Sequence, residues 1–455
     1  MGFRDFLKNL PEVKPPVEKK ISFNTKLKWT LIILISYFVL SNISIFGISE
    51  GSLSRFEYLA ILLGTSFGSI ISLGIGPIVM ASIILQLLVG AQILNIDTTT
   101  VEGKKFFQAI QKLLVFAFVI FEATVYVLMG GIQANPGFTG LVIFQLILGG
   151  LLIVFMDEVV QKWGFGSGVS LFIAAGIGWR LFAQLFQFID PSGTFQPTGK
   201  ILALISSVIQ GDGSGVAQAI FPIIVTALLF LIVTFAQSLR VEVPLAFDRI
   251  RGHTIKWPLN FFYVGVIPVI LVSALAANIQ LFASLLQKGL GSGTFLGTFN
   301  SQGIPVAGLA FWVHSTPILT ELITGSFRWV YALQAFFHIV FYVAFSIIFA
   351  IFWTSTSGMD AASQARNIVK SGMSMPGFRK DERVLESILK RYIGPLTVMG
   401  GAAIGLLASV ANLFGALVGG TAILLAIMII YQLYQDIAQQ HAVDMNPALR
   451  GFFGK

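Results

Sequence analysis

Long apolar runs, each close to the thickness of a lipid bilayer, dominate the hydrophobic pattern of the chain. A helix needs about 20 consecutive apolar residues to cross the hydrocarbon core. By that length the sequence predicts ten transmembrane helices, at residues 29–47, 76–94, 106–129, 138–160, 168–188, 219–239, 259–285, 329–353, 394–414 and 417–435. The expected fold class is an all-α membrane protein.

One further apolar run, Val306–Val313, has only eight residues. It is bracketed by Pro305, His314, Pro317 and Glu321, which interrupt a helix or carry polarity. The run is too short to cross a bilayer. We expect it to fold within an external loop.

Basic residues are distributed unequally between the two sides that ten spans define. Of the 29 Lys and Arg residues, 24 fall on the side of the termini, and the other side holds only Arg55, Arg180, Lys200, Lys288 and Arg328. Cytoplasmic loops of membrane proteins carry the excess of Lys and Arg. We therefore expect a cytoplasmic N-terminal segment (1–28), a cytoplasmic tail (436–455) and an external loop at 189–218.

Composition supports lipid as the main solvent and narrows the possible chemistry. Charged residues make up 11% of the chain, against roughly 25% in soluble globular proteins. The absence of cysteine excludes disulfides, a thiolate nucleophile and Cys-ligated metal. Metal-ligand spacing is also missing from the four histidines, at positions 253, 314, 338 and 441. We expect no metal and no cofactor.

Between the first two spans lies an apolar stretch, Phe56–Ser72, that Gly and Ser residues punctuate. We expect about half a span of helix here. It leads into Leu73–Pro77, where two glycines and a proline interrupt helical hydrogen bonding. Either it is an external loop that dips onto the bundle, or it is a re-entrant segment that closes a pore, since non-helical backbone at membrane depth must be buried or line a cavity.

A second glycine-rich junction, Gly164–Gly168, opens the fifth span. It lacks the Gly-Lys-Ser/Thr of a phosphate-binding loop and follows a helix rather than a strand. Small residues let membrane helices approach closely. Close helix packing is therefore the favoured interpretation.

Polar residues inside the spans are few, and Glu122 is the one charge well inside. A mid-membrane charge is costly and is often part of a transport site, although a protonated carboxyl bonded to a neighbouring helix is equally compatible. His338 is a possible partner. The uncharged residues Gln86, Gln145, Gln237 and Asn278 are interpreted as hydrogen-bonding between helices.

Two predicted cytoplasmic loops, 240–257 and 354–393, carry far more charge than the rest of the chain. One interpretation is that this charge only sets orientation. The other is that clustered Arg and Lys dock a large anionic partner, such as nucleic-acid phosphates.

Several motifs resemble a known family. The run LGIGPIVMASIILQLLVG (73–90) is similar to the second transmembrane helix of SecY, the central subunit family of the protein translocase channel. PEVKPPVEK near the N-terminus also resembles that family, as do GFGSGVSLFIAAG (164–176), IPVILVSALAANIQL (267–281), GFRK (377–380) and RYIGPLTVMGG (391–401). The motifs follow the family's order, and the likeness is to its archaeal branch.

The resemblance implies ten helices in two pseudo-symmetric halves, 29–188 and 219–435, with a re-entrant plug half-helix at about 57–70. It implies a passive protein-conducting channel, which translocates unfolded polypeptides and releases transmembrane segments sideways into the cytoplasmic membrane, with no catalytic residue. The family's pore ring falls on six aliphatic residues: Ile75, Val79, Val169, Ile173, Ile270 and Leu425.

The same resemblance assigns a plug, a lateral gate and a docking surface. The plug includes Leu62, Gly64, Phe67, Gly68 and Ile70; the gate includes Met80, Ser82, Glu122 and Asn278, with Met80 where archaeal relatives have Thr. Ribosome docking falls on Arg240, Arg249, Arg251, Lys256, Arg379, Lys380, Arg383, Lys390 and Arg391. The expected partners are the translating ribosome, signal sequences and nascent polypeptide, the lipid bilayer, and SecE-like and Sec beta-like small membrane subunits.

Two other classes of function are compatible with ten spans. A secondary transporter for a small solute should carry paired ionisable groups at mid-membrane, whereas this sequence has one isolated Glu there. An intramembrane enzyme should carry an Asp pair, a Ser/His pair or an HExxH motif, and none stands at suitable spacing.

Overall fold

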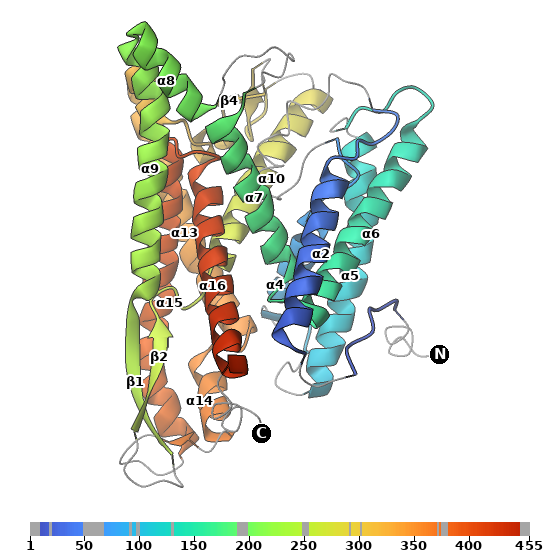
Figure 1. Cartoon of the computed structure of the whole chain (residues 1–455), viewed down its shortest axis with the longest axis vertical. Helices are drawn as coiled ribbons and strands as arrows, with labels where there is room; N and C mark the ends of the chain where they lie inside the picture. Colours follow the sequence, from blue (N-terminus) through green and yellow to red (C-terminus); the bar gives the residue numbers. More distant parts are fainter. Residues whose placement is uncertain are drawn as a thin grey trace. The chain divides into compact units, whose positions relative to one another are not determined.

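The part of the chain that the structure describes is mostly helical (Figure 1). The structure, a computed structural model, describes residues 10–17, 21–48, 68–90, 93–96, 101–128, 132–188, 199–247, 254–290, 293–300, 303–370, 373–374 and 381–445. Ten helices correspond to the predicted spans: α2 (Phe23–Ser41), α4 (Gly76–Gly90), α5 (Val101–Leu128), α6 (Thr139–Trp163), α7 (Gly168–Phe186), α9 (Gly213–Ser238), α10 (Ile267–Leu290), α13 (Trp329–Thr356), α15 (Glu382–Leu413) and α16 (Gly420–Met445).

Nine of these helices, counted over the described ranges, are long and apolar enough to cross a membrane. The tenth, α4, has 15 residues. The first helix begins six residues before the predicted span because the hydroxyl of Ser22 accepts the backbone N–H of Thr25 and caps it there. The prediction was therefore right about the number of helices and wrong about this boundary.

The chain divides into two compact units. Unit 1 comprises residues 1–85, 106–184 and 429–455, and unit 2 comprises 86–105 and 185–428. The division runs through α4, α5, α7 and α16, so each of these helices contributes to both units.

Unit 1 is built around an apolar core between α5, α6 and the residues that precede α4. In the same unit, Tyr37 of α2 stacks on Phe172 of α7 with ring centroids 4.8 Å apart. The junction before α7 packs as tightly as predicted. A Cβ added to Gly164 would come within 2.8 Å of the Thr30 hydroxyl, and one added to Gly168 would come within 2.6 Å of the Asp157 Cα.

The backbone before α4 is not helical. Residues 68–75 form consecutive turns, whereas the sequence predicted a half-span helix that reached Ile70. Gly68 has a φ of +90°, which a helix does not tolerate. The carbonyl of Gly68 accepts the N–H of Ile45 at 2.8 Å, and the N–H of Ile70 donates to the carbonyl of Ile43 at 2.9 Å. Residues 57–67 of the predicted half-helix lie outside the described residues.

In unit 2, α13 and α15 pack against each other along much of their length. Gly401 and Gly405 of α15 form a small-xxx-small pair at the contact. A Cβ on Gly405 would lie 2.7 Å from the Tyr342 carbonyl oxygen, and a Cβ on Gly401 would lie 2.9 Å from the Ala350 Cβ. Such close backbone approach supplies the dispersion contacts that hold helices together in lipid, where apolar burial gives little drive.

The two charge-rich loops of unit 2 fold together. The strands β1 (Arg240–Phe247) and β2 (Thr254–Asn260) form an antiparallel hairpin, and β5 (Met373–Ser374) adds to β1 to give the order β2-β1-β5. Beside the sheet, α14 (Ala361–Lys370) packs on the first turns of α15 (Figure 1). One apolar core joins these elements, formed by Val243, Leu259, Ala365, Ile368, Leu385, Leu389, Ile393 and Leu396.

In its described residues, the connection between α10 and α13 contains short elements: β3 (Thr298–Phe299), β4 (Pro305–Ala307), α11 (Leu309–Val313) and α12 (Ile318–Ile323). The run Val306–Val313 thus lies in a folded loop, as predicted. Gln334 of α13 donates to the carbonyl of Phe311 at 2.7 Å and so fastens the loop to the helix end.

Candidate channel site

Four of the six predicted ring residues lie in unit 1, at the ends of helices that follow non-helical backbone. Ile75 stands immediately before α4, and its carbonyl accepts the N–H of Val79 at 3.0 Å. Val169 and Ile173 occupy the first turns of α7. Ile75 and Ile173 are 2% and 1% exposed.

The remaining two ring residues lie in unit 2. Ile270 is partly buried in the first turn of α10, just after the turns at 261–266. Leu425 is buried in α16. The ring would span both units, and its closure by these six residues stays a prediction.

Asp157 of α6 fixes where α7 begins, and the sequence analysis did not single it out. Its carboxylate Oδ1 accepts the N–H of Val169 at 3.0 Å, while Oδ2 accepts the side-chain amide of Gln161 at 2.8 Å. A carboxylate at a helix N-terminus satisfies free N–H groups and favours the helix dipole. Asp157 therefore positions a predicted ring residue from a neighbouring helix.

The predicted plug lies mostly outside the described residues, which leave out Leu62, Gly64 and Phe67. Gly68 and Ile70 are described, and their backbone is bonded to Ile43 and Ile45. α6 also comes close here, since a Cβ on Gly149 would lie 1.8 Å from the Ile70 carbonyl oxygen. The C-terminal root of the plug is thus fixed within unit 1.

Two predicted gate residues of unit 1 lie on α4. Met80 is partly buried. The hydroxyl of Ser82 donates to the Ile78 carbonyl and accepts the side-chain amide of Gln111 at 2.6 Å. Gln111 of α5 was missed by the sequence analysis, although an amide in an apolar helix is a signal of interhelical bonding. This bond joins α4 to α5.

Glu122 of α5 is partly buried, and its Oε2 has no hydrogen-bond partner within the described ranges. His338, considered as its partner, uses Nδ1 to bond the carbonyl of Val313 at 2.7 Å. Asn278 of α10 donates to the carbonyl of Ala274 in its own helix. The prediction that Gln145 bonds to another helix was wrong: its amide donates to the Phe46 carbonyl and accepts the Phe46 N–H, in the turns that follow α2.

Basic side chains stand exposed on the sheet and on the first turns of α15. Lys256 pairs with Glu242 at 2.5 Å, and this hydrogen-bonded pairing raises the pKa of Lys256 above its usual value. Arg391 makes no ion pair with any described residue. The exposed predicted docking residues are Arg240, Lys256, Arg383, Lys390 and Arg391, whereas Arg249, Arg251, Arg379 and Lys380 lie outside the described residues.

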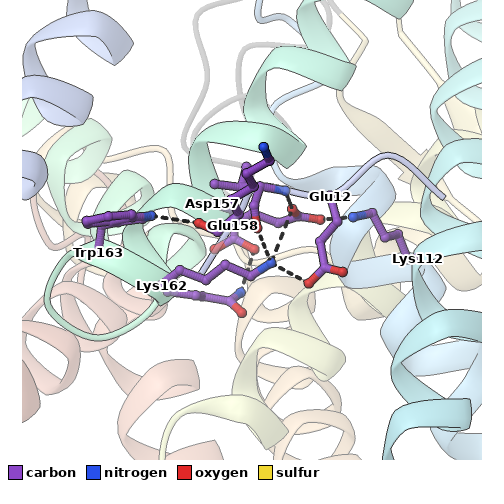
Figure 2. A network of polar contacts seen from close by, with 9 residues as sticks. Glu12, Lys112, Asp157, Glu158, Lys162 and Trp163 are labelled. Carbon is purple, nitrogen blue, oxygen red and sulfur yellow. Dashed lines mark hydrogen bonds and ion pairs between the residues drawn. The ribbon is translucent and has the colours of Figure 1, made fainter. Parts of the chain in front are cut away.

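A charged network in unit 1 holds the N-terminal segment 10–17 against α5 and α6 (Figure 2). Lys112 of α5 pairs with Glu158 of α6, and both side chains are 15% exposed. The other carboxylate oxygen of Glu158 accepts the N–H of Val13 at 2.9 Å. Lys162 pairs with Glu12 and donates to the Val13 carbonyl at 2.6 Å.

The sequence placed Lys112 and Lys162 among the orientation charges and missed this network. The bonds that the N-terminal segment makes in this network join residues about 150 positions apart in the chain, as with Glu12 and Lys162. The hydrogen bond from Lys162 lowers the pKa of Glu12. Because the folded pKa lies below the unfolded one, this contribution is present at neutral pH and is lost as the pH falls through the lowered pKa.

Metal binding has no evident place here. In the part of the chain that the structure describes, no group of three or more His, Cys, Asp and Glu side chains could hold a metal ion. The polar groups described above position helices and carry no arrangement of nucleophile and base.

Comparisons with known proteins agree with this architecture. The SecY family model matches residues 69–434. The protein translocase subunit SecY of Methanothermobacter thermautotrophicus is 43% identical, over 99% of this chain and 98% of its own length. A solved SecY structure described by its plug domain, which stabilises the closed translocation channel and maintains a membrane seal, gives a TM-score of 0.82 at 37% identity, covering 99% of both chains. Sec61 in a canine ribosome–channel complex gives 0.81 at 36% identity, again covering 99% of both.

Reversing one charge of the Lys112–Glu158 pair should destabilise unit 1. Lys112→Glu leaves two carboxylates facing each other in a poorly solvated place, at a cost of about 3 kcal/mol. The double variant Lys112→Glu with Glu158→Lys should recover part of the loss, because it restores an opposite-charge pair but removes the carboxylate that accepts the Val13 N–H. Thermal unfolding of the detergent-purified chain measures both, with Lys370→Glu, an exposed reversal on α14, as control. A double variant no more stable than the single one would contradict the pairing.

Proposed function

The chain belongs to the SecY family, and so it is a multi-pass membrane subunit of a protein-conducting channel rather than an enzyme. We propose how its residues divide that work. The N- and C-termini and the charge-rich sheet face the cytoplasm, and the protein resides in the cytoplasmic membrane. The unequal distribution of Lys and Arg supports this orientation.

We infer that Ile75, Val79, Val169, Ile173, Ile270 and Leu425 form the pore ring. The observation that carries this is positional: α4, α7 and α10 each have a ring residue within one turn of their first residue, directly after non-helical backbone. Such backbone at membrane depth is tolerated where it is buried or lines a cavity. Aliphatic side chains around an empty pore stop ions by dewetting and offer a passing polypeptide no fixed hydrogen bonds.

Residues 57–70 act as the plug beneath this ring, hinged at the fixed root around Gly68. The lateral gate runs along α4 and α5 on one side and α10 and α13 on the other. Its polar residues are Ser82, Glu122 and Asn278, and the apolar Met80 is also part of it. Signal sequences and apolar nascent segments leave through it into lipid. SecE-like and Sec beta-like small subunits complete a heterotrimer, as the family resemblance implies.

Truncating the ring should open an ion leak. Ile75→Gly combined with Ile270→Gly removes aliphatic bulk, so the resting channel should conduct ions in planar bilayers well above the wild type. The matched control is Ile120→Gly with Ile224→Gly, the same change at positions that are 53% and 42% exposed. Equal leak from both pairs, or none from the ring pair, would refute the ring assignment.

We also propose that the sheet and the first turns of α15 dock the translating ribosome. Sec61, the 36% identical relative, is itself found in a ribosome–channel complex. The exposed cations of this face suit RNA phosphates, whose neutralisation makes binding salt-dependent. The sheet, α14 and α15 share one apolar core, so the exposed cations are carried on a single packed structure.

Neutralising Arg391 should weaken ribosome binding and lower its salt slope by about one. Lys256→Gln should matter less, because Glu242 already engages that ammonium group. Lys200→Gln, placed on the opposite side of the membrane by the proposed orientation, should have no effect. Co-sedimentation with ribosomes over a salt series measures all three. A loss with Lys200→Gln as large as with Arg391→Gln would overturn the assigned face.

A further inference from the structure

An additional helix, α8 (Lys200–Gln210), lies within the segment that the sequence predicted to be a plain external loop. The N–H of Gly199 donates to the carbonyl of Gln187 at 2.9 Å, so α8 starts close to the end of α7. Gly211, with a φ of +70°, ends it, and the Asp212 side chain caps α9. α8 and α9 pack together as a helical hairpin in unit 2 (Figure 1).

The amphipathic arrangement of α8 is the reverse of that in a water-soluble protein. Ser207 faces α9: its hydroxyl is so near that a Cβ on Gly215 would come within 2.6 Å of it. Residues two positions apart lie roughly 200° apart around a helix. Ile205 and Ile209 therefore point away from α9, and they are 52% and 80% exposed. Val208, three positions after Ile205 and so on the adjacent part of the helix surface, is 61% exposed.

The outward apolar face continues the surface that α9 presents to lipid. Along α9, Ile224, Leu228 and Leu231 are 42%, 52% and 63% exposed. The helix has 26 residues, so it is about 39 Å long, longer than the hydrocarbon core of about 30 Å. A helix of this length extends past the core or tilts within it. Ser214 and Gln218 in the first turns of α9 are polar and exposed, which places these turns in the headgroup region, and α8 packs along them.

The tip of the hairpin, residues 210–214, is polar and exposed. Asp212 accepts the N–H and the hydroxyl of Ser214, and the hydrogen bond from that hydroxyl lowers the pKa of Asp212. The carboxylate thus stays charged and exposed at the tip, next to Gln210 and Gly211. A polar tip above an apolar outward face is the arrangement of an interfacial helix.

We propose that α8 is such an interfacial helix, and that Ile205, Val208 and Ile209 are seated at the boundary between lipid headgroups and acyl chains at the outer face of the bilayer. The location of α8 at the outer side of the membrane rests on the orientation proposed above for the whole chain. Lipid contact here holds the connection between α7 and α9 at a constant depth in the membrane.

The test uses the absence of native cysteine, which makes any introduced thiol unique. Ile205→Cys and Gln210→Cys each receive a nitroxide spin label in the full-length chain, in complex with its subunits and reconstituted in phosphatidylcholine–phosphatidylglycerol vesicles. Both positions are exposed in the chain, and they lie on opposite sides of α8. Collision rates with oxygen, which concentrates in lipid, and with a water-soluble nickel chelate are measured for each label.

The ratio of oxygen to nickel collisions should be several-fold higher at Ile205 than at Gln210. Equal ratios would show that water covers both sides and would overturn the proposal. Low rates for both reagents at Ile205 would show that a protein subunit covers the face, which also overturns it. The readout does not involve conduction, so failure here in a preparation that still translocates leaves the channel function standing.

Discussion

The requirement that every backbone polar group in lipid find a partner within the protein governs this structure. Ten helices meet it through their own hydrogen bonds. Where the chain leaves helical geometry at 68–75, it meets the requirement in two other ways: short turns such as Gly74 N–H to Ile71, and bonds to Ile43 and Ile45. Residues 71–77 are buried, so this irregular backbone is covered by protein. The proposed ring and plug root lie where that covering is needed.

In lipid, close approach of helix backbones and buried hydrogen bonds hold the helices together, as the burial of apolar side chains does in water. Gly401 and Gly405 bring the backbones of α13 and α15 together, and the carboxylate of Asp157 receives the first turn of α7. The network of Lys112, Glu158 and Lys162 ties the N-terminal segment to α5 and α6. These contacts lie within single units, two of them in unit 1 and one in unit 2.

Much of the fold could be predicted from the sequence because an uncharged apolar run of span length is typical of a transmembrane helix and of little else. The short elements could not. α8 has 11 residues, too few for the span criterion, and its two serines interrupt the apolar pattern. The network escaped prediction because Glu12 and Glu158 acquire their roles only from partners far away in the chain. The ring residues look like ordinary core by composition, and only the family resemblance marks them.

The central claim is that a polypeptide passes through the aliphatic ring, and a single cross-link tests it most directly. Ile270→Cys, or Phe282→Cys at a 58% exposed position of the same helix, would be the only thiol in the chain. A ribosome-stalled secretory chain with one cysteine in mid-segment is then offered under mild oxidation. A disulfide adduct at Ile270 and none at Phe282 is the predicted result. An engaged chain that forms no adduct at Ile270, or forms it equally at Phe282, would contradict the account.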